Sequence, residues 1–132
     1  MNRKELENLA REWISLWCAP TDRDLFDRLQ ADDFEDGSPA GRETSKSAFA
    51  AGLDEFLSAF PDLQAKVEDL VVDEAAQEIA IRWSATGTNR RKFLGVGPTG
   101  KSMSFRGIEI IGLQDGRIRF RWGEWDGGKE NG

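Results

Sequence analysis

The sequence has 132 residues, the size of a single domain with one core. Its formal net charge is −6, and residues 1–66 carry 8 basic and 14 acidic groups against 10 of each in residues 67–132. Because a phosphate-binding surface needs clustered basic side chains, this balance argues against nucleic acid as a partner. No apolar run approaches the length of a membrane span, so we expect no membrane partner either.

Two residue types are missing: the sequence contains no histidine and no tyrosine. The lack of histidine removes Ser-His and Cys-His nucleophiles and every His-based metal site, and we expect neither a metal nor another cofactor. Cys18 is the single cysteine, so no intrachain disulfide can form, and we expect a reducing, cytoplasmic compartment. The N-terminus begins with charged residues instead of an apolar signal core.

The N-terminal half predicts three helices, because apolar residues recur there at helical spacing. Residues able to cap a helix precede each of them: Asn2, Thr21 or Asp22, and Thr44 or Ser45. The first helix should end before Pro20, and Pro61 ends the third. Residues 31–41, between the second and third helices, are rich in turn formers, with a short strand around Phe34.

The rest of the chain predicts four β-strands, over residues 63–73, 78–88, 103–113 and 117–125. Asp115-Gly116 joins the last two strands into a hairpin. Helices first and long strands later indicate an α+β fold, with the helices packed on one face of an antiparallel sheet. We expect a single domain over residues 1–126 and a disordered tail over residues 127–132.

Residues 95–102, GVGPTGKS, match the phosphate-loop pattern GxxxxGK[ST]. That pattern requires a following helix whose N-terminus faces phosphate, whereas residues 103–111 are strand-like. Pro98 also removes one amide donor from the loop. We therefore predict that the chain binds neither ATP nor GTP.

Several short motifs resemble one known family and together cover roughly the whole chain. They lie at residues 60–63, 82–83, 87–89, 93–101, 115–118 and 122–126. These motifs are similar to those of the SnoaL-like polyketide cyclases, a branch of the NTF2-like superfamily. The resemblance implies a strongly curved sheet wrapped around helices, with a conical pocket. Because this fold hosts many enzymes and also non-catalytic binders, it leaves open whether the chain is an enzyme.

Glu109 is the most informative charge, because it lies mid-strand in a run of residues that is otherwise without charge. If it is buried in a pocket, its ionised form is disfavoured, and we expect a protonated carboxyl that donates a hydrogen bond. The resemblance places it where polyketide cyclases carry a catalytic His and ketosteroid isomerases a proton-donating Asp. The alternative is a structural ion pair with an arginine of a neighbouring strand: Arg106, Arg119 or Arg121.

Asp36 and Asp126 are the candidates for a catalytic base. The resemblance to ketosteroid isomerases places Asp36 near their general base, after a two-residue gap, and Trp13 where they have an oxyanion-binding Tyr. The alternatives are a turn for Asp36 and a core position for Trp13. The second cyclase residue, an Asp in the last strand, falls on Gly123 here, and Glu124 and Asp126 are the nearest carboxylates.

Aromatic side chains exceed what a small core needs, and ligand pockets are mostly apolar with a few polar groups. The expected ligand-binding residues are Trp13, Trp17, Phe34, Phe60, Trp83, Phe93, Arg121 and Trp125. We expect a small, largely apolar ligand, which the resemblance suggests is polyketide- or steroid-like. An enzyme would use Glu109 as acid and Asp36 or Asp126 as base, in a metal-free cyclisation or isomerisation of a carbonyl compound. The alternative is a ligand-binding or assembly module without chemistry.

The last predicted strand carries two alternating sets of side chains: Ile118, Phe120 and Trp122, and then Arg121, Gly123 and Trp125. The resemblance to ketosteroid isomerases implies that the second set faces the pocket. The first set would then form an exposed apolar patch, which a two-fold partner would cover. We therefore expect a homodimer through the outer face of the sheet. The opposite orientation would bury the first set and need no partner.

Overall fold

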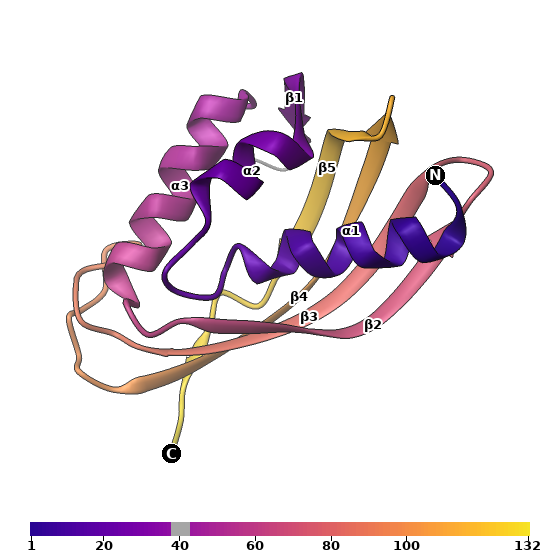
Figure 1. The fold of residues 1–132 in the computed structure, drawn as a ribbon. Helices are drawn as coiled ribbons and strands as arrows, with labels where there is room; N and C mark the ends of the chain where they lie inside the picture. Colours follow the sequence, from indigo (N-terminus) through magenta and orange to yellow (C-terminus); the bar gives the residue numbers. More distant parts are fainter. Residues whose placement is uncertain (38–42) are drawn as a thin grey trace.

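The computed structural model describes residues 1–37 and 43–132. Its elements, in chain order, are α1 (Arg3–Ser15), α2 (Arg23–Leu29), β1 (Gln30–Asp36), α3 (Lys46–Ala59), β2 (Gln64–Asp73), β3 (Glu78–Thr88), β4 (Ser102–Gln114), β5 (Arg117–Trp125) and β6 (Lys129–Glu130). The three helices lie on one side of a curved sheet (Figure 1). The predicted α+β fold is thereby confirmed. None of the described helices is long and apolar enough to cross a membrane.

Each helix begins at one of the predicted capping residues. Asn2 and Glu5 form a capping box at α1, in which each side chain accepts a hydrogen bond from the other residue's backbone N–H. Asp22 caps α2 and Ser45 caps α3 through the same type of side-chain acceptor. These bonds satisfy backbone donors that a helix start would otherwise leave unpaired.

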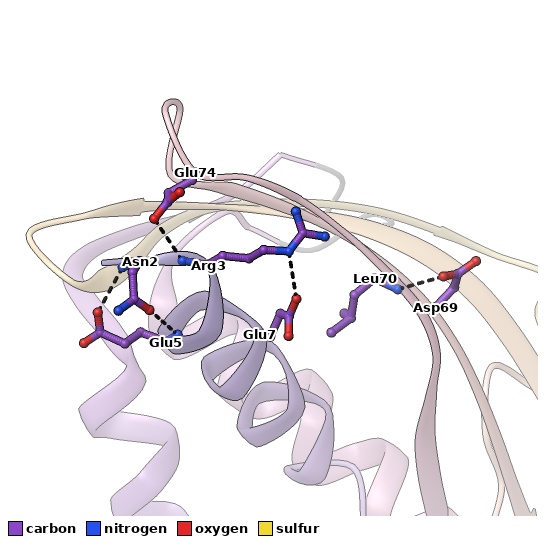
Figure 2. A network of polar contacts seen from close by, with 7 residues as sticks. All are labelled: Asn2, Arg3, Glu5, Glu7, Asp69, Leu70 and Glu74. Carbon is purple, nitrogen blue, oxygen red and sulfur yellow. Dashed lines mark hydrogen bonds and ion pairs between the residues drawn. The ribbon is translucent and has the colours of Figure 1, made fainter.

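The start of α1 is fixed against the turn between β2 and β3. The backbone N–H of Arg3 donates to Oε1 of Glu74 at 3.0 Å (Figure 2). Gln77 adds two bonds to Met1, because its Oε1 accepts from the amino terminus and its Nε2 donates to the carbonyl, both at 2.9 Å. The helix is therefore held in one orientation across the sheet.

The strand order is β1-β5-β4-β3-β2, with β1 parallel to β5 and the other neighbours antiparallel. The small strand β6 pairs with β4 at Met103 and Ser104. This differs from the expectation of a disordered tail over residues 127–132. The reason is local, since Gly127 and Gly128 adopt positive φ angles of 75° and 87° and turn the chain back towards β4.

The phosphate-loop-like segment connects β3 to β4. A strand begins at Ser102, so the motif runs into β4 and not into a helix, as the sequence predicts. Asn89 holds the segment closed, because its N–H donates to the Lys101 carbonyl at 3.0 Å and its carbonyl accepts from Gly100 at 2.8 Å. That the chain binds no nucleotide stays a prediction.

A β-bulge changes the direction of side chains in the first half of β5. The pairing between β4 and β5 shifts register between Gly112 and Leu113, opposite Phe120 and Ile118. Ile118 is fully buried in the core, so the expectation that it faces outward is wrong. An extra residue in one strand turns the following side chains to the opposite face. A strict alternation of faces along the strand does not predict such a bulge.

Asp62 joins the end of α3 to the end of β3. Its two carboxylate oxygens accept hydrogen bonds from the N–H and the hydroxyl of Thr88, both at 2.7 Å. These bonds, the backbone one first, lower the pKa of Asp62. Since the folded-state pKa lies below the unfolded one, the stabilisation is present above the unfolded pKa and is lost as the pH falls through the folded one.

We expect Asp62→Ala to lower the free energy of unfolding by about 1 kcal/mol at pH 7, because two hydrogen bonds to a charged but exposed group are removed. The difference from wild type should fade below about pH 4. Urea denaturation at both pH values measures this. Asp32→Ala is the control, since Asp32 is exposed and makes no side-chain hydrogen bond among the described residues. If Asp62→Ala changed the free energy of unfolding equally at both pH values, the stabilisation would not come from the ionised carboxylate of Asp62.

Candidate functional site

A cavity of about 520 Å³ lies between α1, α3 and the inner face of strands β2 to β5. Its volume falls within the range of small-molecule sites, and its walls are mainly apolar and aromatic. Five of the eight predicted ligand-binding residues line it: Trp17, Trp83, Phe93, Arg121 and Trp125. The bulge in β5 therefore leaves the predicted inward orientation of Arg121 and Trp125 intact.

The other three predicted ligand-binding residues lie in the core and do not line the cavity. Trp13, Phe34 and Phe60 are almost completely buried. The indole of Trp13 stacks on Phe49 at 5.6 Å and meets the edge of Trp17 at 5.2 Å. Helical periodicity identifies the inward face of α1, but it does not separate core positions from cavity positions.

Four side chains from separate elements form a buried polar cluster beside the cavity, and two of them, Glu109 and Arg121, line it. Glu109 of β4 is only 3% exposed; its Oε2 accepts from Nη2 of Arg121 at 3.1 Å, and its Oε1 accepts from the indole N–H of Trp13. Arg121 of β5 also donates from Nη1 to Oδ1 of Asp36 at 3.0 Å. Asp36, at the end of β1, is 1% exposed. Two buried carboxylates therefore share one guanidinium.

The electrostatics of this cluster keep the guanidinium charged. Burial lowers the pKa of Arg121, but the negative charges of Glu109 and Asp36 raise it, and the net shift of the pKa is upward. Both groups that reach Glu109 can only donate hydrogen bonds. Glu109 therefore accepts at both oxygens, which differs from the expected hydrogen-bond donor. The ion pair with Arg121 that the sequence left open is present, and it lies at the cavity.

Gly123 explains how Arg121 reaches Glu109. It pairs directly with Glu109 across the β4–β5 ladder, and both residues line the cavity. A Cβ on Gly123 would lie 2.6 Å from Nη2 of Arg121 and 3.2 Å from Cβ of Glu109. The guanidinium thus occupies space that any larger residue would fill. A Cβ at position 123 would therefore require the guanidinium of Arg121 to shift from the place where it meets Glu109.

The two predicted bases lie in different places. Arg121 bridges Asp36 to Glu109, and Asp36 does not itself line the cavity. Asp126 lies outside the cavity, where its Oδ1 accepts from the backbone N–H of Arg106 at 3.2 Å and of Gly128 at 3.0 Å. The structure therefore joins Asp36 to the cluster and leaves Asp126 apart from it.

Helix α3 supplies cavity residues that the sequence analysis did not assign to a site. Phe49, Gly52 and Phe56 line the cavity from one face of the helix, and Glu55 lies at its exposed side. The helical spacing of apolar residues in this segment predicts that both phenylalanines face the core. A glycine within that face is the signal that could have identified them, since it leaves space beside the two rings.

Comparisons with known proteins agree with this architecture. A model of the SnoaL-like polyketide cyclase family matches residues 7–128. Among curated protein sequences, none matches the chain. Many solved structures resemble it, and the three described next are from Streptomyces species.

AclR of Streptomyces galilaeus, a proposed hydroxylase, is 27% identical with a TM-score of 0.82, over 94% of this chain and 80% of AclR. TsrD of Streptomyces laurentii is 22% identical with a TM-score of 0.84, over 96% of this chain and 91% of TsrD. IdmH of Streptomyces antibioticus, a proposed polyketide cyclase, is 23% identical with a TM-score of 0.77, over 92% and 91%. At such identities, the last two show a common fold and no more.

Proposed function

The chain belongs to the SnoaL-like polyketide cyclase family, and from this membership and its cavity we propose that it binds a small, largely apolar carbonyl compound and cyclises or isomerises it by acid–base chemistry. The observation that carries the proposal is the position of Glu109. It is a buried carboxylate in the wall of a cavity lined mainly by aromatic rings. Such a group is suited to move a proton on an apolar ligand that has displaced water.

Glu109 is the base in this proposal, because both of its oxygens act as acceptors. It takes a proton from a carbon next to a carbonyl group, which leaves an enolate. In a cyclisation, the enolate carbon attacks a second carbonyl of the same molecule; in an isomerisation, Glu109 returns the proton to another carbon. Asp36 acts through Arg121 and so is a positioning residue, not the base.

Fluorescence and isotope exchange test the proposal together. Trp17, Trp83 and Trp125 line the cavity, so a bound ligand should change the intrinsic tryptophan fluorescence. Titration with α-tetralone, an apolar ketone with exchangeable protons beside its carbonyl, measures binding. NMR in D₂O then measures exchange at that carbon, which wild-type protein should accelerate over buffer. Absence of binding by α-tetralone and by larger aromatic ketones would contradict the proposal.

A non-catalytic binding module is the second candidate. Two features favour it: protein donors already occupy both oxygens of Glu109, and Gly123 stands where the cyclases carry an Asp. In that case the buried cluster only stabilises the fold beneath a ligand site. Binding of α-tetralone without accelerated exchange would support this function over catalysis.

We also propose that the chain forms a homodimer through the outer face of the sheet. Pairing across four strands places Val71, Ala80, Ile110 and Trp122 in one row on this face. Ile108 lies beside the row, and Trp122 is 54% exposed. Large exposed apolar side chains that gather on one face favour a partner surface, and a two-fold contact pairs the patch with itself.

Trp122→Glu should convert such a dimer to a monomer, because it would place a charge in the centre of the contact. Sedimentation velocity at micromolar concentration measures the change. Leu94→Glu is the matched control, since Leu94 is also an exposed apolar residue but lies in the loop between β3 and β4. A monomeric wild type, or a dimer that Trp122→Glu leaves unchanged, would disprove this interface.

A further inference from the structure

Arg121 lines the cavity and carries hydrogen-bond donors that Asp36 and Glu109 do not use. Its bonds to Asp36 and Glu109 take one N–H from each Nη atom, whereas a guanidinium carries five N–H groups. Its Nε has no acceptor among the described residues. Arg121 is also the only cationic side chain among the described residues that line the cavity. A ligand with an acceptor oxygen would accept from one of the N–H groups that remain on the two Nη atoms.

The guanidinium is held rigidly at this place. Asp36 and Glu109 fix its two Nη atoms, and its central carbon lies 5.1 Å from the ring centre of Phe49. Gly123 provides the space into which it extends. A charged donor fixed before the ligand arrives needs no reorganisation during a reaction, which is the condition under which it stabilises developing charge best.

We propose that Arg121 is a second catalytic residue, which donates a hydrogen bond to the carbonyl oxygen of the ligand and stabilises the enolate formed when Glu109 takes the neighbouring proton. This inference rests on the proposed function. In the step, the C–H bond breaks and its proton goes to Glu109. The electron pair of that bond becomes the C=C bond of the enolate, and the π pair of the carbonyl moves to the oxygen beside Arg121.

The separation of the two groups fits this step. Arg121 and Glu109 are in direct contact at 3.1 Å, so a carbon beside Glu109 and the oxygen of its neighbouring carbonyl can meet base and donor together. The substrate class follows from the arrangement: an apolar molecule with an enolisable ketone whose oxygen is oriented towards β5. A hydrocarbon of the same shape would fill the cavity but use neither group.

Binding of two probes of the same shape tests the role of Arg121. The probes are α-tetralone, which has a carbonyl oxygen, and tetralin, which lacks it, each titrated by tryptophan fluorescence. Arg121→Met should weaken α-tetralone binding about tenfold or more, because a charge-assisted hydrogen bond is lost. Tetralin binding should change less than about twofold, since no polar contact is involved. The proposal would be overturned if Arg121→Met weakened the binding of both probes equally, or if it left the binding of both unchanged.

A second variant protects the test against misfolding, because Arg121→Met leaves two buried carboxylates without their counter-charge. Gly123→Ala keeps every charged group, but its Cβ would force Nη2 of Arg121 to move. We expect the same selective loss for α-tetralone. Gly112→Ala is the matched control, because its Cβ would meet nothing closer than 3.6 Å. Unchanged α-tetralone binding in Gly123→Ala would overturn the proposal.

The isotope-exchange readout separates this proposal from the proposed function. If the wild-type protein bound neither probe, the proposed function would fail and the role of Arg121 with it. If the wild type bound both probes and exchanged protons, and Gly123→Ala and Arg121→Met did so at the wild-type rate, the role of Arg121 alone would fail. Support requires a slower exchange in both variants together with the selective loss of α-tetralone affinity.

Discussion

Trp13→Ala is expected to lower the free energy of unfolding by about 4 kcal/mol. Trp13 is fully buried, and its indole packs against rings from the turn after α1 and from α2, β1 and α3: Trp17, Phe26, Phe34 and Phe49. Truncation leaves a large cavity among these rings, which close-packed neighbours fill only in part. It also removes the hydrogen-bond donor to buried Glu109. Chemical denaturation of both proteins measures the difference.

Trp13→Phe reduces the packing contribution, since it keeps a six-membered aromatic ring and removes the five-membered ring that carries the indole N–H. We expect a loss of about 1–3 kcal/mol, the typical cost of a hydrogen bond to a buried charged group. Val96→Ala is the control, because Val96 is an exposed apolar residue in the loop between β3 and β4, and it should change stability by less than about 1 kcal/mol. If Trp13→Phe were as stable as wild type, the bond to Glu109 would contribute nothing.

Local sequence patterns suffice for most of this fold because the signals act within a few residues. The capping residues, the prolines after α1 and α3, and the Asp115-Gly116 turn each define a boundary that the structure confirms. The bulge beside Ile118 and the strand β6 were not predictable in this way. Both depend on how distant segments pair with β4, and a local pattern holds no information on that pairing.

The candidate site shows the same division between local and distant information. Glu109 stands out because a single charge interrupts an apolar strand. Its link to Asp36 cannot be recognised in the sequence, because Arg121 and Asp36 are 85 residues apart and meet through the parallel pairing of β1 with β5. The unusual Gly123 was visible as a departure from the cyclase pattern. Only the structure shows that the Arg121 guanidinium fills the space it leaves.

Glu109→Gln is expected to have the largest effect on chemistry, a loss of about 10²–10⁴-fold in the rate of proton exchange at the ligand. The amide has the size of the carboxylate, but it cannot take up a proton from carbon. Asp36 still neutralises Arg121 in this variant, so the fold should be retained. NMR in D₂O with α-tetralone measures the rate, and circular dichroism checks the fold.

Two controls decide what a loss in Glu109→Gln means. Glu78→Gln changes an exposed glutamate of β3 that does not line the cavity, so its exchange rate should equal that of wild type. Tetralin has no polar group, so its affinity should be the same in wild type and Glu109→Gln if the cavity keeps its shape. Slow exchange with unchanged tetralin binding identifies Glu109 as the base. A wild-type exchange rate in Glu109→Gln would instead make the carboxylate structural, because its only remaining function would be to hold Trp13 and Arg121 in place.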